Sequence, residues 1–220
     1  MIAQRARLLV AEFVGTFALV FFGCGAIMVD ADHGGLGQVG ISLAFGVVVM
    51  VMVFALGHVS GAHINPAVTF GLAIRHRFPW VEVPGYWVAQ VAGAIVAALA
   101  LRAALGDVAN LGATSPSGSD LQSFAWELVM TAALLFVIFA VATDARAAAG
   151  VAAVAIGGTI ALASLVGGPI SGASLNPARS LGPAVVSGSL SSLWIYLAAP
   201  LVGGALGAIL YAWVKRASPP

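Results

Sequence analysis

The stretch Ser60-Gly61-Ala62-His63-Ile64-Asn65-Pro66-Ala67 decides the fold, because it returns almost unchanged as Ser171-Gly172-Ala173-Ser174-Leu175-Asn176-Pro177-Ala178. The offset between the two copies is about half of the 220-residue chain. Each copy contains an asparagine followed by proline, a pair typical of a helix start. Asparagine caps the first turn, and proline lacks only an N–H that would be unpaired there. A polar helix start duplicated in an apolar chain predicts a site where two repeats meet.

The composition is that of a membrane protein. Apolar residues make up 61% of the chain and charged residues 8%, against roughly 45–50% and about 25% in soluble domains. One aqueous core cannot hide so much apolar surface, so we expect contact with membrane lipid. The net charge of +1 and the absence of a basic run argue against a nucleic-acid partner. The single cysteine, Cys24, is interpreted as a small packing residue.

Six apolar stretches are long enough to cross about 30 Å of hydrocarbon. They are residues 8–29, 39–57, 84–105, 124–142, 150–167 and 192–214, with loops predicted at 30–35, 106–122 and 143–149. Two shorter stretches, 65–74 and 176–186, are only about half as long as the hydrocarbon is thick. The sequence therefore predicts an all-α integral membrane fold with six transmembrane helices and two half-helices, each half-helix beginning at its asparagine.

The basic residues predict the orientation of the chain. Most Lys and Arg side chains fall on one side of a six-span topology: Arg5, Arg7, Arg75, Arg77, Arg146, Lys215 and Arg216. By the positive-inside rule both termini are then cytoplasmic. Three spans in each half make the halves inverted repeats, at about residues 1–110 and 111–220 of a single transmembrane domain. In that arrangement the half-helix starts at Asn65 and Asn176 meet near the middle of the membrane.

The segment before each half-helix must present its carbonyl groups to something polar, because non-helical backbone at membrane depth has to be packed in protein or line a wet cavity. We expect these pore-lining carbonyls to be those of Gly61, Ala62, His63, Gly172, Ala173 and Ser174. Two helix N-termini and two asparagine amides would form a positive field that repels cations and orients water, which breaks the hydrogen-bonded chain that a hopping proton needs. Water or a hydroxylated solute fits such a site.

Three ionisable residues lie within the apolar regions. Arg179 follows the second motif, and an unpaired arginine in the membrane costs roughly 2.5–3.5 kcal/mol, so it usually faces a water-filled path; snorkelling to the interface is the alternative. Glu12 and Glu127 occupy matching places in the two halves. They fit either a proton relay or acceptors that brace the loop N–H groups, and their symmetry favours bracing. His58 and His63 lack ligand partners, so neither a metal nor a cofactor is expected.

With these motifs the chain resembles the major intrinsic protein family, the aquaporins and aquaglyceroporins. The resemblance rests on the two Asn-Pro-Ala boxes at 65–67 and 176–178, on Arg179, on Ala11-Glu12-Phe13 and on Ser42-Leu43-Ala44-Phe45-Gly46. It implies six tilted helices, two half-helices, a pore in each subunit and usually a homotetramer. It also implies an outer selectivity filter, carried over to Phe45, Ser164, Ala173 and Arg179.

The filter departs from strict water channels, which typically have His at the position of Ser164 and Cys or Thr at that of Ala173. Glycerol channels usually carry Asp and a basic residue where this chain has Ser180 and Ala184. The surrounding sequence is most similar to the nodulin-26-like branch or a bacterial relative of it, although Phe45 is not that branch's usual residue. Members of the branch are associated with water, glycerol and uncharged metalloid acids.

We therefore expect a passive channel for water and small uncharged solutes such as glycerol, boric acid or arsenous acid, closed to protons and ions. A strictly water-selective channel is the first alternative. A secondary transporter is the second, because inverted repeats and broken helices occur there too. A membrane enzyme is disfavoured, because no nucleophile–base pair is visible. Short termini without a targeting segment favour a bacterial inner membrane.

Overall fold

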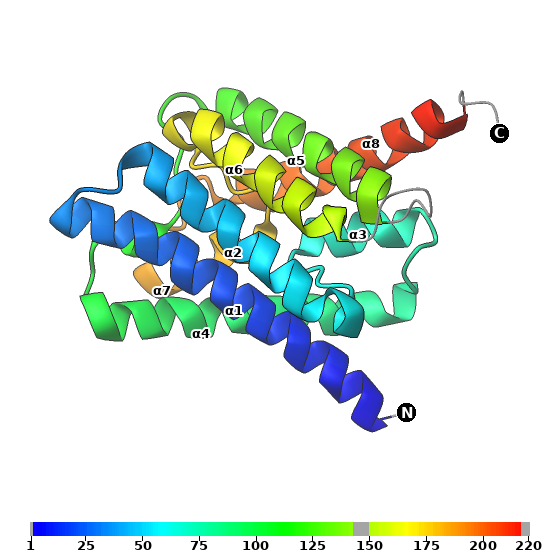
Figure 1. Ribbon diagram of the computed structural model, residues 1–220. Coiled ribbons are helices and arrows are strands. Elements are labelled where there is room, and N and C mark those ends of the chain that lie inside the picture. Colours follow the sequence, from blue (N-terminus) through cyan, green and yellow to red (C-terminus); the bar gives the residue numbers. More distant parts are fainter. Residues whose placement is uncertain (1, 143–149, 217–220) are drawn as a thin grey trace.

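The computed structural model describes residues 2–142 and 150–216, and all regular secondary structure within these ranges is helical (Figure 1). The α-helices are α1 (Ile2–His33), α2 (Gly37–Ser60), α3 (Pro66–Ile74), α4 (Val83–Leu105), α5 (Asp120–Ala142), α6 (Val151–Ser171), α7 (Pro177–Ser187) and α8 (Leu193–Arg216). Two short 3-10 helices, η1 (Trp80–Glu82) and η2 (Ala109–Gly112), lie in the connections around α4.

Six of the helices, α1, α2, α4, α5, α6 and α8, are long and apolar enough to cross a membrane. The helices α3 and α7 have only 9 and 11 residues, so neither can cross alone. The predicted fold of six spans and two half-helices is therefore confirmed. The N-terminal end of α1 and the C-terminal end of α8 point to the same side of the bundle (Figure 1), as an even number of crossings requires.

Two predicted loops are partly helical. Residues 30–33 continue α1, because this charged end of the helix can extend into water beyond the apolar span. The carboxylate of Asp30 accepts hydrogen bonds from the N–H groups of Leu36 and Gly37, at 2.9 and 2.8 Å, and so caps the start of α2. The loop predicted at 106–122 contains η2 and the first residues of α5. The loop predicted at 143–149 lies outside the described residues.

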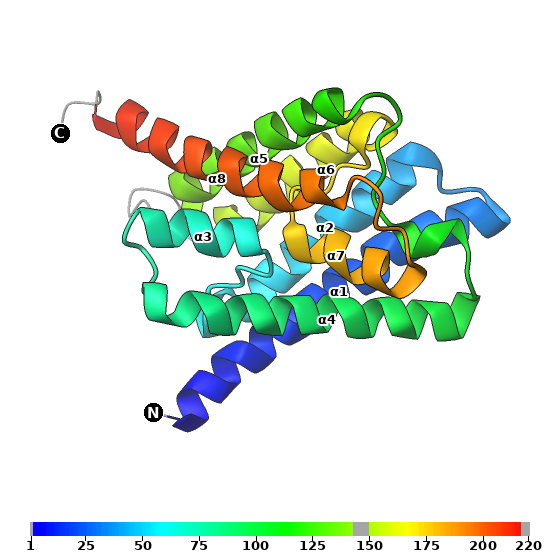
Figure 2. The same ribbon diagram turned by 180° about the vertical axis from the view of Figure 1, so that it is seen from behind.

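The half-helices begin where their asparagines cap them. The Asn65 side chain accepts a hydrogen bond from the N–H of Ala67 at 2.8 Å, and that of Asn176 accepts from Ala178 at 3.0 Å. Each half-helix then packs against a spanning helix of the opposite half: α3 lies along α8, and α7 along α4. Figure 2 shows both short helices between α4 and α8, end to end.

The remaining helix contacts come in matched pairs around one central contact. Helix α1 packs against α2 and α4, as α5 packs against α6 and α8, and α2 packs against α6. These contacts use glycine where backbones approach closely. A Cβ added to Gly157 of α6 would lie 2.5 Å from the carbonyl oxygen of Gly46 on α2. Gly93 on α4 and Gly203 on α8 face the carbonyl groups of Phe13 and Leu128 in the same way.

Gly157 and Gly158 offer a matched test of this packing. A methyl group at 157 would lie 2.5 Å from Gly46 O and 2.7 Å from Met50 Cβ, whereas one at 158 would meet nothing within 4 Å. We expect Gly157→Ala to destabilise the protein by about 1–3 kcal/mol through overpacking. Gly158→Ala should be neutral or stabilising by about 0.5–1 kcal/mol. Apparent melting temperatures of the purified variants in detergent measure the difference, and equal temperatures would contradict the close α2–α6 contact.

Candidate functional site

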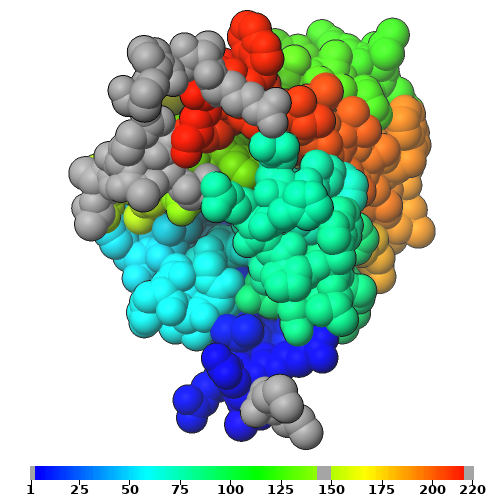
Figure 3. All heavy atoms as spheres, turned by 90° about the vertical axis from the view of Figure 1, so that its right-hand side faces the viewer, coloured from blue at the N-terminus to red at the C-terminus, as the bar shows by residue number. Residues whose placement is uncertain are grey.

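A cavity of about 780 Å³ runs through the centre of the bundle. Its walls come from α1, α2, α3, α5, α6 and α7 and from both non-helical segments that precede the half-helices. It reaches from Phe45, Ser164, Ala173 and Arg179 to His58, Arg77, Ala142 and Gly150. The second group belongs to the end of α2, the loop after α3, the end of α5 and the residue before α6. These ends lie on the side of the molecule that carries both termini (Figure 1), which Figure 3 shows from outside. The sequence-predicted filter and the two asparagines thus line one space.

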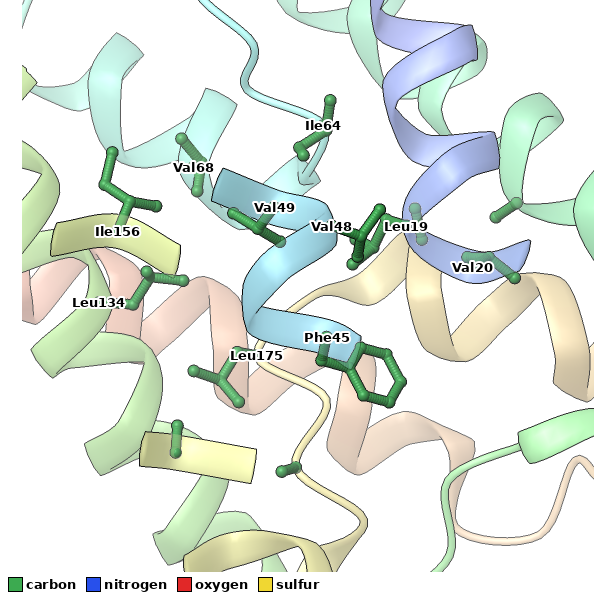
Figure 4. Packing of buried hydrophobic residues seen from close by; sticks show 14 of the residues in the cluster. Leu19, Val20, Phe45, Val48, Val49, Ile64, Val68, Leu134, Ile156 and Leu175 are labelled. Carbon is green, nitrogen blue, oxygen red and sulfur yellow. The ribbon is translucent and has the colours of Figure 1, made fainter. Parts of the chain in front are cut away.

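Much of the cavity wall is apolar. Leu19, Phe45, Val49, Val68, Leu134 and Ile156 all line the space and belong to the hydrophobic core. Figure 4 labels these residues together with Ile64 and Leu175, which lie on the two non-helical segments. An apolar wall with few polar groups gives a passing molecule few places to form hydrogen bonds. Several of the polar groups belong to the two non-helical segments that precede α3 and α7.

The two asparagines join the halves at the centre of the cavity. The Asn65 side-chain N–H donates to the carbonyl of Leu175 at 2.8 Å, and that of Asn176 donates to the carbonyl of Ile64 at 2.9 Å. Each side-chain oxygen is occupied by its own helix start. A carboxamide nitrogen carries two hydrogens, so each asparagine keeps one N–H for a molecule in the cavity.

The non-helical segments have the same unusual backbone in both halves. Positive φ angles recur at Gly61 (87°), Ala62 (47°), Ile64 (42°), Gly172 (83°), Ala173 (43°) and Leu175 (54°). A residue other than glycine in this region costs roughly 1–2 kcal/mol, so the segments persist only because their surroundings hold them.

Most residues predicted to offer pore-lining carbonyls do border the cavity. They are Gly61, Ala62, His63, Ala173 and Ser174. Gly172 is the exception: it does not line the cavity, and a Cβ at this position would be 3.2 Å from the Thr114 side chain. The loop between α4 and α5, here called the outer loop, contains Thr114 and covers Gly172. The repeat pattern did not reveal this contact.

Two buried glutamates hold the strained segments. The Glu12 carboxylate accepts hydrogen bonds from the N–H groups of His63 and Ile64, at 2.9 and 2.6 Å. The Glu127 carboxylate accepts from those of Ser174 and Leu175, both at 2.8 Å. Neither glutamate lines the cavity. This geometry supports loop bracing and speaks against a proton relay through the pore.

Arg179 is almost fully buried, with 1% of its surface exposed, so snorkelling to the interface does not occur. Its Nη1 donates to the carbonyl of Gly112 at 2.8 Å. Its guanidinium lies 4.9 Å from the ring centroid of Phe45, within the range of a cation–π contact. Its Nε has no hydrogen-bond partner within the described part of the chain. Arg179 thus places its guanidinium in the cavity wall beside Phe45, with a buried Nε that no described residue accepts from.

Several residues that shape the site were not predicted. Gln90 of α4 donates to the Glu12 carboxylate at 2.7 Å, and Gln38 donates to the carbonyl of Ser164 at 2.6 Å. Gln90 stands alone as an amide within an apolar span, and that contrast was a usable signal. The roles of Gly112 and Thr114 depend on contacts with α7, more than sixty residues away, and had no local signal.

The first motif contains His63, whose side chain is buried. The His63 ring packs against Phe78 and Tyr86, and its Nδ1 lies 3.1 Å from Thr69 Oγ1. Within residues 2–142 and 150–216, no three His, Cys, Asp or Glu side chains are grouped as metal ligands would be.

Comparison with known proteins agrees with this geometry. Residues 2–211 match the family model described as major intrinsic protein. The chain belongs to the major intrinsic protein family. It is 49% identical to aquaporin NIP1-4 of Oryza sativa subsp. japonica over 210 residues, which cover 95% of this chain and 77% of that protein. It is 46% identical to nodulin-26 of Glycine max over 214 residues, covering 96% and 79% of the two chains.

A solved structure extends the comparison to the fold. The X-ray structure of the aquaglyceroporin from Plasmodium falciparum superposes with a TM-score of 0.86 at 28% identity, covering 96% of this chain and 97% of the other. The expected family, its nodulin-26-like relatives and the fold class are confirmed. So is the expected passive channel for water and small solutes in a multi-pass membrane protein.

Replacing Glu127 by Gln tests the bracing of the second segment. The carboxylate accepts three hydrogen bonds, from Ser171 Oγ and from the N–H groups of Ser174 and Leu175. A glutamine turns one acceptor oxygen into a donor and leaves a buried N–H unpaired, at a cost of about 1–3 kcal/mol. We expect a lower apparent melting temperature and reduced water permeability in proteoliposomes.

The matched control is Glu82→Gln. Glu82 pairs with Arg5 near the surface, and such pairs contribute about 0–1 kcal/mol. Equal effects of the two substitutions would contradict the bracing role of Glu127.

Proposed function

We propose that this channel conducts water and small uncharged hydroxylated solutes, with glycerol, boric acid and arsenous acid as candidates, and that it excludes protons and ions. The observation that carries the proposal is the single cavity shared by the Asn65–Asn176 junction and by the side chains of Phe45 and Arg179. We propose that the selectivity filter consists of Phe45, Ser164, Ala173 and Arg179. We propose that the two helix starts consist of Asn65, Pro66, Ala67, Asn176, Pro177 and Ala178.

The proposed filter has one apolar and one polar side. Phe45 offers an aromatic surface and Arg179 offers its guanidinium, and both residues line the cavity. A molecule with C–H groups on one face and hydroxyl groups on the other would satisfy both sides at once, whereas a bare ion would lose its hydration shell without replacement. Ser164 and Ala173 add little bulk, which favours solutes larger than water.

The charge of the cavity wall supports the exclusion of cations. The wall contains Arg77 and Arg179 but neither Asp nor Glu among the described lining residues. The starts of α3 and α7 add the positive ends of two helix dipoles at the centre. A water there is held by the free N–H groups of Asn65 and Asn176 through its oxygen, so its hydrogens point away from both. The hydrogen-bonded path for a proton is broken at that point.

Two alternatives follow from the same architecture. A strictly water-selective channel would share the asparagine junction but would reject glycerol at the filter. A secondary transporter would need a coupling-ion site, yet the two buried carboxylates, Glu12 and Glu127, already accept hydrogen bonds from the strained segments. This occupation favours the channel.

Three further features belong to the proposal. We propose that residues 1–110 and 111–220 form inverted repeats of one domain, which the matched helix contacts support. We propose a homotetramer, which the family resemblance supports. We also propose cytoplasmic termini, because Arg5, Arg75 and Arg77 lie on the side of the termini. The relatives described above come from plants and give no support to the bacterial inner membrane expected from the sequence.

The glycerol-to-water permeability ratio tests the solute range. We expect proteoliposomes with the wild-type protein to swell in glycerol faster than empty liposomes, and to conduct water without a proton current. Stopped-flow light scattering and an entrapped pH dye measure the two. Water flux alone would establish the strictly water-selective alternative. Uphill glycerol uptake driven by a proton or sodium gradient would establish the transporter.

Substituting Ser164→His tests the width of the filter. Ser164 lines the cavity together with Phe45 and Arg179, so an imidazole at this position would take up space between them. Raising the barrier for glycerol by about 1.4 kcal/mol would slow it about tenfold, and we expect water to be slowed less. Ser164→Ala, which keeps the width, is the control. A proportional loss of glycerol and water flux in Ser164→His would show that Ser164 does not set the size limit.

A further inference from the structure

The residue after Arg179 lies at the centre of a buried chain of hydroxyl groups. Ser180 Oγ is 2.6 Å from Ser174 Oγ and 2.8 Å from Thr114 Oγ1. All three side chains are buried, with exposed fractions of 0% for Ser180 and 6% for the other two. They come from α7, from the segment before it and from the outer loop between α4 and α5.

The direction of this chain follows from counting protons. Ser174 donates its single hydroxyl proton to the carbonyl of Asn176 at 2.9 Å. Each hydroxyl has one proton, so when Ser174 donates to Asn176, Ser180 donates to Ser174 and Thr114 donates to Ser180. The chain therefore runs from Thr114 in the outer loop to the backbone of the asparagine at the pore centre. Hydrogen bonds aligned in this way polarise and strengthen one another.

The outer loop is attached to the filter at two neighbouring points. The carbonyl of Gly112 holds the Arg179 side chain, and the hydroxyl of Thr114 holds Ser180. Thr114 also covers Gly172, where an added Cβ would be 3.2 Å from its Cβ and Cγ2. The loop thus contacts both segments that supply Ala173 and Arg179 to the cavity wall.

The first half of the chain has a similar set of three polar side chains. His63 and Thr69 match Ser174 and Ser180, but the third side chain comes from a spanning helix and not from a loop. Thr69, which matches Ser180, donates to the carbonyl of Asn65 at 3.1 Å and lies 3.1 Å from His63 Nδ1. Its further partner is Gln90 Nε2 at 3.0 Å, from the spanning helix α4. Thr69, which supports Asn65, is therefore held by the spanning helix α4. Ser180, which acts on Asn176 through Ser174, is held by the outer loop.

We propose that Thr114 is a positioning residue of the selectivity filter, which acts through Ser180 and Ser174 to hold the segment 172–174 and the start of α7 at the width that sets solute selectivity. The proposal deepens the proposed function and rests on it. Without the Thr114 hydroxyl, the chain loses its first donor and the segment gains freedom. A solute that needs the widest filter conformations gains more from that freedom than water does.

Thr114→Val tests the proposal, because valine keeps the shape of the side chain and removes the hydroxyl. We expect the glycerol-to-water permeability ratio to rise roughly two- to tenfold, the change that loss of one neutral hydrogen bond produces in a barrier. Thr114→Ser, which keeps the hydroxyl, should restore the wild-type ratio. Thr159→Val is the control: its hydroxyl donates only to Ala155 within α6, and it does not line the cavity.

Ser180→Ala provides a second route to the same answer if Thr114→Val assembles poorly. It should raise the ratio as Thr114→Val does, and the double variant should show no further rise, since both substitutions break one chain. A ratio that does not rise in either single variant, or that rises equally in Thr114→Ser, would overturn the proposal.

The wild-type measurement separates this proposal from the proposed function. A wild-type protein that passes water but no glycerol would refute the solute range by itself. The role of Thr114 is then decided by glycerol entry in Thr114→Val. Glycerol flux in that variant, absent from Thr114→Ser and Thr159→Val, supports the role, and its absence from all three overturns it.

Discussion

The structure depends on two reciprocal hydrogen bonds at its centre, from Asn65 to the carbonyl of Leu175 and from Asn176 to that of Ile64. Each asparagine caps its own half-helix through its oxygen and ties down the opposite segment through its nitrogen. Aspartate could cap but could not donate, and serine has only one proton to give. Only a short carboxamide does both and still leaves an N–H for the pore. The junction therefore fixes the geometry of the two segments and the chemistry of the passage together.

The strained backbone around this junction needs support from outside it. Ala62, Ile64, Ala173 and Leu175 adopt left-handed conformations that an unsupported loop would leave. Buried carboxylates provide the support by accepting the N–H groups that such a backbone cannot pair internally. A charge buried in a membrane protein is costly, and here several hydrogen bonds offset the cost of each carboxylate. Glu12 and Glu127 thus stabilise the backbone conformation of the two segments that line the pore.

Physical rules explain which of these features the sequence predicted. The apolar spans, the helix starts at Asn-Pro and the paired glutamates each have a local signature, namely length, capping chemistry and an isolated charge in an apolar run. The end of α1 was predicted wrongly. Asp30 and Asp32 are typical of a loop between spans, but a helix can continue beyond the membrane into water, and α1 ends only at His33. Thr114 and Gly112 had no signature in the sequence, since a small residue in a long loop gains such a role only from partners that are distant along the chain. Local sequence patterns therefore predicted the spanning helices and the two half-helices of the pore. The contacts that Gly112 and Thr114 make with α7 could be found only in the folded structure.

The contacts of the outer loop also explain why the two halves carry different residues at the cavity wall, although their helices pack in the same way. Val68 and Arg179 hold equivalent positions after the two Asn-Pro-Ala boxes, and both line the cavity. An arginine at this depth is tolerated only with partners, and Arg179 has the carbonyl of Gly112 and the ring of Phe45. Gly112 belongs to the outer loop, which packs against α7, and the structure describes no corresponding loop against α3. An arginine at position 68 would lack that acceptor. Within residues 2–142 and 150–216, a loop that supplies an acceptor for a charge covers α7 and none covers α3, and this difference makes the filter asymmetric.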